Sequence, residues 1–544
     1  MKKVLILISA AVIMMAGCTK DGGDSTPMNA NFIYSPESPT SGQQVEMTAT
    51  VTGGKSPYSY SWKISSLADL SGQKATYTFS TYGSYQVTLT VTDASGAKVT
   101  KKKMVDVIPA EKPETGAIEV LWGAKIEGYS TISSPALDNS GNVYAVTRAN
   151  KMYKFNSSGV QQSVRDIPNA VSGAVTWGTP AIDTDGTIYL CSGTYTNGGQ
   201  ASGRFAAYNS SDLSDKWYFA QFWAMSGKTP KPNMFATNPA IGQDNVYMGY
   251  AGDNGTIMAV SKADGKLVGR LERAGKGIAG GARSGVVLSK AGYVHYYGGK
   301  YGIGAGSASA LDAANGGATD WAWHNNAELP NQSYSSLACL DVNGNTCVAG
   351  IVTDNEGTVV YAVNSQSGSN VCQYRVEDTY AQEQGGVVAT AEGYIVASLK
   401  THRTKETGGI IVVNPATGAL VARYSTCEDV SGSPAVDAAG NIHFFTEDGD
   451  YYVVNKNCEL LVKKNLFTIL SNHSTLSNTY SGLTGVKFWS SPAIDSNGKV
   501  YIQFTDAGQT WGGVLCLKYA GCTGPGATAW PMMGHDASRT NRQN

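Results

Sequence analysis

Short apolar runs separated by tight polar turns dominate the chain, and one such unit recurs along it. In its clearest copy, apolar runs at residues 134–137, 143–146 and 151–155 are separated by turns rich in Asn, Ser and Gly. A further run begins at Val160, after the turn 156–159. Runs of this length, bounded by turn residues, predict β-strands joined by hairpins rather than helices. The unit is therefore predicted to contain four short strands.

The first strand of the unit carries the phrase Ser-Pro-Ala-x-Asp or a close variant. Clear copies lie at residues 133–138, 178–183, 432–437 and 490–495. The proline or its equivalent recurs about every 45 to 60 residues, at Pro135, Pro180, Pro239, Val286, Ala338, Val387, Pro434 and Pro492. Four strands repeated at this period predict an eight-bladed β-propeller. The alternative is seven blades, if the degenerate unit at Val286 or Val387 is an insertion.

The two ends of the repeat region predict how the ring closes. The last unit has a first, a second (499–503) and a third strand (513–519), but no clear fourth strand. Residues 120–123, which precede the first unit, read as a fourth strand without a blade of its own. We expect this N-terminal strand to complete the last blade.

A separate unit is predicted upstream, at residues 29–108. Residues 44–51 and 85–91 alternate polar and apolar side chains, and Trp62 is a candidate core residue, so the pattern predicts an antiparallel β-sandwich. The order of residues 59–62, 75–79 and 82–93 resembles the PKD family of Ig-like domains. The family's Trp-x-Phe-Gly-Asp-Gly is absent, because Lys63-Ile64-Ser65-Ser66 follow Trp62. The resemblance implies a spacer, which the Pro-rich linker 109–116 joins to the repeats.

The repeated phrase and the C-terminal segment 530–540 resemble the PQQ-like (quinoprotein-type) propeller family. The resemblance covers residues 117–544 and implies a β-propeller. It leaves function open, because the family includes quinoprotein dehydrogenases, outer-membrane assembly scaffolds and binding proteins. The vicinal Cys-Cys pair of the dehydrogenases does not occur in the chain, so we expect no PQQ and no other cofactor. The six histidines show no metal-ligand spacing, and we expect neither a metal site nor catalytic residues.

The N-terminal residues predict the cellular location of the protein. Lys2 and Lys3 precede the apolar run 4–16, and residues 15–18 (Met-Ala-Gly-Cys) resemble the bacterial lipobox. We expect residues 1–17 to be a lipoprotein signal peptide, Cys18 to be lipidated and residues 18–28 to be a flexible tether. Residues 19–24 resemble the surface-export signal of Bacteroidetes lipoproteins. The predicted location is the outer membrane, lipid-anchored and facing the cell exterior.

Length, charge and cysteines narrow the remaining possibilities. A chain of 544 residues exceeds one ordinary core, so at least two domains are expected. The net charge of −1 offers no basic face for nucleic acid. Cys339 and Cys347 flank the turn 341–345, and Cys516 and Cys522 are close in sequence, so both pairs are disulfide candidates. Buried free thiols are the alternative for all four.

Connection lengths point to one face of the propeller. The first-to-second and third-to-fourth strand turns are short, whereas the other two kinds of connection carry the extra length and lie together on the opposite face. Binding usually lies where long loops gather on a rigid scaffold. The candidate ligand-binding aromatic residues near these connections are Trp177, Tyr195, Trp223, Tyr301, Trp489 and Trp511.

Aromatic rings with polar neighbours suit carbohydrate, because the ring packs on sugar C–H groups while polar side chains bind the hydroxyls. The predicted function is therefore that of a non-enzymatic surface lipoprotein that binds a polysaccharide or oligosaccharide as an accessory to a nutrient-uptake system. An outer-membrane transporter complex is a further expected partner. The alternatives are a protein-interaction scaffold or adhesin of the outer membrane and, third, a polysaccharide-degrading enzyme.

Overall fold

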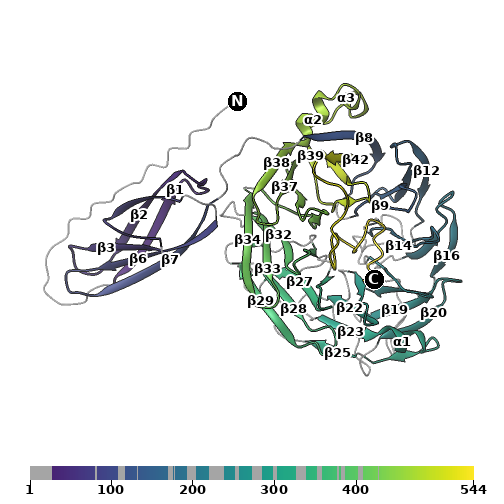
Figure 1. Ribbon diagram of the computed structural model, residues 1–544, viewed down its shortest axis with the longest axis horizontal. Helices are drawn as coiled ribbons and strands as arrows, with labels where there is room; N and C mark the ends of the chain where they lie inside the picture. Colours follow the sequence, from purple (N-terminus) through teal and green to yellow (C-terminus); the bar gives the residue numbers. More distant parts are fainter. Residues whose placement is uncertain are drawn as a thin grey trace, which may run out of the picture. The chain divides into compact units, whose positions relative to one another are not determined.

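The computed structural model describes most of the chain. The described residues are 27–65, 67–79, 83–107, 117–130, 133–168, 176, 178–192, 204–219, 238–250, 256–271, 285–297, 303–320, 322–325, 338–351, 358–376, 379–380, 386–401, 408–426 and 428–543. They form two compact units, made mainly by residues 27–105 and 106–543. Both units are built almost entirely from β-strands (Figure 1). No helix among the described residues has the length and apolar character that a membrane crossing requires.

The first unit is the predicted β-sandwich, with sheets in the strand orders β1-β2-β5 and β4-β3-β6-β7. Its strands are β1 (Asn29–Ser35), β2 (Gln44–Thr52), β3 (Ser59–Ile64), β4 (Ala68–Ser71), β5 (Lys74–Thr78), β6 (Gly83–Thr92) and β7 (Lys98–Val107). Along β2 the side chains of Val45, Met47 and Ala49 are buried, which confirms the predicted alternation. Trp62 is fully buried, lies edge-on to Phe32 and donates its Nε1–H to the Gly72 carbonyl 2.8 Å away.

The second unit is a β-propeller: Figure 1 shows its sheets arranged around a common centre, with the C-terminus near that centre. Within the described residues it contains eight sheets, which we number in chain order. Sheet 1 contains β9 (Ala136–Leu137), β10 (Val143–Val146), β11 (Lys151–Phe155) and β12 (Gln161–Asp166). Sheet 2 contains β13 (Ala181–Ile182), β14 (Ile188–Ser192), β15 (Arg204–Tyr208) and β16 (Asp215–Phe219). Sheet 3 contains β17 (Ala240–Ile241), β18 (Asn245–Tyr250), β19 (Thr256–Ser261), β20 (Leu267–Leu271) and the added β24 (Ala318–Thr319).

The remaining sheets repeat this plan. Sheet 4 contains β21 (Val286–Leu288), β22 (Tyr293–Tyr297), β23 (Ile303–Ser307) and β25 (Trp323–Asn325). Sheet 5 contains β26 (Cys339–Leu340), β27 (Thr346–Ile351), β28 (Thr358–Val363) and β29 (Asn370–Val376). Sheet 6 contains β30 (Thr379–Tyr380), β31 (Val387–Ala389), β32 (Ile395–Thr401), β33 (Gly408–Asn414) and β34 (Ala419–Thr426). Sheet 7 contains β35 (Ala435–Val436), β36 (Ile442–Phe445), β37 (Asp450–Val454) and β38 (Leu460–Asn465).

Sheet 8 joins the two ends of the propeller. It contains β39 (Val486–Lys487), β40 (Ala493–Ile494), β41 (Lys499–Asp506), β42 (Trp511–Tyr519) and β8 (Ile118–Glu127). Strand β8 pairs antiparallel with β42, with Trp122 opposite Cys516, so the first strand of the repeat region supplies the outermost strand of the last sheet. This pairing confirms the predicted closure.

Among the residues that the structure describes, three short helices interrupt the strands. Helix α1 (Ala308–Asp312) lies between β23 and β24, while α2 (Leu466–Asn472) and α3 (Leu476–Thr479) lie between sheets 7 and 8. Helix α1 makes the turn after the third strand of sheet 4 longer than the pattern predicts. Asp312 accepts hydrogen bonds from the Asn245 side chain and the Tyr247 hydroxyl of sheet 3, so this longer connection ties two sheets together.

The C-terminal segment 524–543 crosses the centre of the propeller and bonds to the innermost region of every sheet described. Carbonyls of this segment accept the backbone N–H groups of Leu137, Ile182, Ile241, Leu288, Ala389 and Val436, which end the innermost strands of sheets 1, 2, 3, 4, 6 and 7. The Gln543 side chain donates to the carbonyl of Asp341 in sheet 5, and Arg539 donates to that of Ser491 in sheet 8. Since an innermost strand has no inner neighbour in its own sheet, the segment satisfies a free strand edge.

Arg539 anchors this segment. Its buried guanidinium donates to the carbonyl oxygens of Pro135, Met533 and Ser491. Burial lowers the pKa of Arg539 to about 9. Because the bonded innermost residues lie next to the first-to-second strand turns, the segment occupies the centre at the short-turn face of the propeller.

Candidate binding face

The serines of the repeated phrase form hydrogen bonds between neighbouring sheets. The Ser134 N–H donates to Thr179 Oγ1 (3.1 Å), Ser433 N–H to Ser491 Oγ (2.8 Å) and Ser491 N–H to Ser134 Oγ (2.8 Å). Thr179 N–H donates to Asn238 Oδ1, and Gly386 N–H to Ser433 Oγ, in the same way. These side chains therefore act as structural acceptors around the ring, so none of them is a candidate nucleophile.

The aspartates of the phrase shape the turns that follow it. Oδ1 of Asp138, Asp341, Asp437 and Asp495 accepts the backbone N–H groups two and four residues later. The other oxygen of Asp138 and of Asp495 accepts the hydroxyl of Tyr144 and of Tyr501, respectively. Such self-contained turns explain the recurrent Asp-x-x-Gly without a calcium ion.

Two buried histidines take the place of that tyrosine. His295 on β22 and His443 on β36 are fully buried. His295 Nδ1 lies 2.9 Å from Thr346 Oγ1, and burial lowers the pKa of His295 to about 3, so its imidazole is neutral. His443 Nε2 lies 3.0 Å from Asp437 Oδ2, where sheets 1 and 8 have a tyrosine hydroxyl.

We call the surface opposite the C-terminal segment the long-loop face; the connections that leave the second and fourth strands lie there. Four of the six predicted ligand-binding residues, Trp177, Tyr195, Trp223 and Tyr301, lie outside the described residues. Trp489 and Trp511 are described, and both are half-buried. Trp489 lies in the connection between sheets 7 and 8, and Trp511 is the first residue of β42 in sheet 8.

The position of Trp511 differs from the prediction. The sequence pattern ends the second strand at residue 503 and begins the third at 513, but β41 continues to Asp506 and β42 begins at Trp511, so the connection is a shorter turn. The Trp511 ring stacks on Tyr480 (centroids 6.1 Å apart, planes 9° apart), and Lys125 Nζ lies 3.8 Å from the Trp511 ring centroid. A sugar could stack on Trp511 only if one of these neighbours moved.

Charged groups gather on the same face between sheets 6 and 7. Lys400 lies at the end of β32, and its Nζ is 3.2 Å from Glu447 Oε1 and 3.6 Å from Asp429 Oδ2. Burial acts against the charge of Lys400, but the two carboxylates outweigh it and raise the lysine's pKa. Glu447 also accepts a hydrogen bond from the Ser431 hydroxyl. Further round the ring, Arg148 donates to the Tyr129 hydroxyl at 3.0 Å and packs over its ring.

The four cysteines of the predicted pairs are buried free thiols in the structure. Cys339 and Cys347 lie directly opposite each other on β26 and β27, as the hairpin spacing predicts. Cys516 lies beside Tyr501, whereas Cys522 lies beside Asp437 and His443. Burial raises the pKa of Cys516 and of Cys522 to about 12 each, so neither is an activated thiolate. Disulfide pairing of either couple stays a prediction.

The residue group that sequence reasoning missed is Asp437, His443 and Cys522. The first two belong to one repeat, where a histidine replaces the usual tyrosine, and this substitution was the available signal. Cys522 follows a different sheet, so only the closed ring brings it to the other two. No spacing rule along the chain links the three residues.

Comparison with known proteins agrees with this architecture. Residues 25–107 match the PKD domain family. No curated protein matches the chain. Among solved structures, the quinohemoprotein alcohol dehydrogenase ADHIIG from Pseudomonas putida HK5 is 12% identical with a TM-score of 0.50, and the match covers 74% of this chain and 76% of that one. BamB from Moraxella catarrhalis is 11% identical with a TM-score of 0.48, and the match covers 74% and 98%, respectively.

The C-terminal WD40 domain of Sif2 is 9% identical with a TM-score of 0.49, and the match covers 74% of this chain and 99% of that one. At these identities, the likeness to the alcohol dehydrogenase shows the fold alone. The chain is thus a PKD domain followed by a β-propeller, the fold that the alcohol dehydrogenase match also shows.

Proposed function

We propose that this protein is a binding protein whose long-loop face holds a polysaccharide or oligosaccharide. The observation that carries the proposal is the asymmetry of the propeller. The C-terminal segment occupies the centre at the short-turn face and bonds there to the innermost strands, while the longest stretches of sequence between strands follow the second and fourth strands, which end at the opposite face. A ligand that approaches the centre of the ring therefore meets the long-loop face.

The side chains described on this face suit a glycan. Trp489 supplies a half-buried ring, and Lys400, Asp429 and Glu447 supply charged donors and acceptors within one connected group. A ring of this kind packs on the C–H face of a sugar, and the polar groups bind its hydroxyls. The group needs no cofactor, PQQ included, and we propose a non-enzymatic role.

The proposed setting follows from the N-terminal sequence. Lipidation at Cys18 would anchor the protein in the outer membrane, and the tether and PKD domain would hold the propeller toward the cell exterior. There it would serve a nutrient-uptake system as an accessory to a transporter complex. We further propose that each of the eight sheets is one blade, in preference to a seven-bladed ring.

Affinity electrophoresis tests the binding proposal. The mature chain without its lipid should be retarded in native gels that contain a polysaccharide to which it binds, screened across a broad glycan panel. Trp489→Ala should weaken the apparent affinity at least about fivefold, since stacking on an aromatic platform contributes about 1–3 kcal/mol. Tyr394→Ala is the matched control, because Tyr394 is likewise half-buried but lies in the first-to-second strand turn of sheet 6, on the short-turn face.

Retardation of the wild type by no glycan in the panel would overturn the proposal. Equal loss in both variants would place the binding site elsewhere. New reducing ends or unsaturated products in the same mixtures would instead identify a polysaccharide-degrading enzyme.

A protein-interaction scaffold or adhesin is the second candidate, and the rim of the propeller favours it. The outermost strands β12, β16 and β34 expose Val164 (47%), Tyr218 (56%) and Val421 (43%). Exposed apolar side chains on strands with a free edge are typical of surfaces that pair with another protein. This candidate predicts co-purification with a membrane protein after mild detergent extraction, unaffected by Trp489→Ala.

A further inference from the structure

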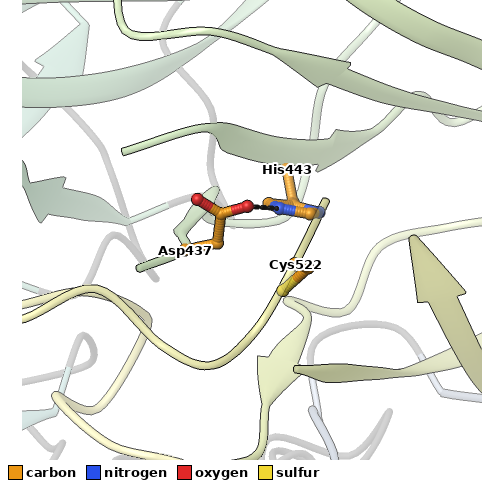
Figure 2. Close-up of side chains that lie close together, drawn as sticks. All are labelled: Asp437, His443 and Cys522. Carbon is orange, nitrogen blue, oxygen red and sulfur yellow. Dashed lines mark hydrogen bonds and ion pairs between the residues drawn. The ribbon is translucent and has the colours of Figure 1, made fainter. Parts of the chain in front are cut away.

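Three chemically different ligand groups meet in the interior between sheet 7 and the segment that follows β42. Asp437 begins the first turn of sheet 7, His443 lies on β36, and Cys522 follows β42 (Figure 2). The side chains are fully buried or nearly so. A carboxylate oxygen, an imidazole nitrogen and the sulfur lie within 4.8 Å of one another, and among the described residues this is the group of three or more such side chains close enough to share a metal ion.

We propose that Asp437, His443 and Cys522 form a structural site for a divalent metal ion, with Zn²⁺ as the preferred ion. One thiolate, one imidazole and one carboxylate are the donor types that Zn²⁺ combines in proteins. Ca²⁺ and Mg²⁺ prefer oxygen donors only, so the sulfur and nitrogen select against them. On binding, the metal takes the place of the Cys522 thiol proton, which passes to solvent, and no electron is transferred.

The surrounding hydrogen bonds hold the ligands in place. His443 Nδ1 lies 2.6 Å from the Tyr451 hydroxyl, so the ring can donate from Nδ1 and present the lone pair of Nε2 on the side of Asp437. Asp437 Oδ1 accepts the N–H groups of Ala439 and Asn441, and the Asn441 side chain donates to Oδ2 at 3.0 Å. Hydrogen bonds to ligand groups from the surrounding protein orient these groups toward a metal.

The comparison with the neighbouring sheets sharpens the inference. In sheets 1 and 8 the same carboxylate position is closed by a phenol, Tyr144 on Asp138 and Tyr501 on Asp495. A neutral phenol is not among the usual zinc ligands, whereas imidazole is. Sheet 7 has the imidazole, and the turn after β42 brings a thiol to it. The site combines two changes from the repeat pattern, one in each of two distant segments.

The position of the site gives the metal a mechanical role. Asp437 and Pro525 form a β-bridge, and the Ala438 N–H donates to the Gly524 carbonyl, so this is where the chain leaves β42 and begins its path across the centre. A metal ion there would join sheet 7 to the start of that path by coordination as well as by hydrogen bonds.

Metal analysis of the full chain tests the proposal. The protein is refolded with Zn²⁺, or with Co²⁺ as a spectroscopic probe, and freed of loosely bound ion by gel filtration. We expect about one equivalent of metal per chain and, with Co²⁺, a thiolate-to-metal charge-transfer band. His443→Tyr and Cys522→Ser should lower the bound metal at least about tenfold and remove the band, since each deletes one of three ligands.

Two features keep the test decisive. His443→Tyr restores the Asp–Tyr pair that sheets 1 and 8 already contain, so the variant is expected to fold. Cys516→Ser is the matched control, because Cys516 is a buried free thiol nearby in sequence that lies outside the group, and it should keep the metal. Absence of stoichiometric metal from the refolded wild type, or full retention by His443→Tyr, would overturn the proposal.

Discussion

At the scale of single residues, the polar side chains of the repeat serve the backbone. At the centre of a propeller, the ends of the innermost strands carry N–H groups for which their own sheet offers no hydrogen-bond acceptor. The Ser491 hydroxyl accepts the N–H of Ser433 and the Ser134 hydroxyl accepts that of Ser491, so one hydroxyl links sheet 7 to sheet 8 and another links sheet 8 to sheet 1. A buried N–H without an acceptor costs about 1–3 kcal/mol, which explains why a hydroxyl recurs at this place.

Replacement of one of these hydroxyls should therefore destabilise the propeller. Ser491→Ala removes the acceptor of the buried Ser433 N–H and should lower the free energy of unfolding by about 1–3 kcal/mol. Ser140→Ala, at an exposed turn position, should change it by less than about 0.5 kcal/mol. Urea denaturation followed by tryptophan fluorescence measures both, and equal midpoints for the two variants would contradict a role for the hydroxyl.

Some contacts of single residues can be predicted from the sequence, and others cannot. The recurrence of Ser and Asp at fixed positions predicts that they are structural, and the hydrogen bonds of Asp138 and Asp495 agree. The partnership of His443 with Cys522 has no such periodicity, because it depends on which segment the closed ring brings to sheet 7. A contact made once cannot be read from a repeat.

At the scale of elements, three tryptophans fasten one sheet to the next. Trp122 on β8, Trp217 on β16 and Trp323 on β25 each belong to the outermost strand of a sheet. Their Nε1–H groups donate to the carbonyls of Ser157, Lys262 and Ser365 in the third-to-fourth strand turns of sheets 1, 3 and 5. Each indole also covers the glycine of that turn, where added atoms would collide with the ring.

A pair of glycine substitutions isolates this contact. Gly265 and Gly292 both have positive φ (71° and 80°), so alanine strains the backbone at either position. A Cβ at Gly265 would lie 2.6 Å from Trp217 Cε3, whereas nothing lies within 4 Å of a Cβ at Gly292. Gly265→Ala should therefore be more destabilising than Gly292→Ala by about 1–3 kcal/mol in thermal or urea unfolding. Equal losses in the free energy of unfolding would show that the Trp217 indole moves aside at no cost.

Element boundaries were harder to predict than element order. The strand order and the closing role of β8 follow from the sequence pattern, but the start of β42 does not. Gly512 suggests that the strand begins only at Gly513, yet β42 already begins at Trp511 and contains both glycines. A Cβ there would lie 2.5 Å from the Phe504 carbonyl oxygen or 2.3 Å from the Phe504 ring, so glycine marks a close approach of β42 to β41.

At the scale of the whole molecule, the C-terminal segment acts as a common partner for sheets far apart in sequence. Its bonds to the innermost strands make each sheet's position depend on the same short stretch of chain. Arg539 is central to this arrangement, since its guanidinium spans carbonyls of sheet 1, sheet 8 and the segment itself. The Trp-Pro-Met stretch at 530–532 indicates that the segment is structural, but the sequence does not reveal which strands it contacts.

Removal of this guanidinium should weaken the entire ring. Arg539→Met leaves three buried carbonyls without their donor and should lower the free energy of unfolding by at least about 2 kcal/mol. Arg542→Met is the control, because Arg542 is exposed in the same segment, and it should unfold like the wild type. Differential scanning calorimetry compares the two variants, and coincident transitions would show that the segment stays in place without Arg539.

The pairing of β8 with β42 also sets the order of events during synthesis. Roughly 380 residues separate Glu127 from Trp511, which at about 5–20 residues per second corresponds to about 20 to 80 seconds of translation. For that time β8 has no edge to join, whereas the PKD domain ahead of it is complete. The first strand of the propeller to be synthesised is thus the last to be paired. Until β42 is made, the edges of β8 are unpaired and open to pairing with other strands.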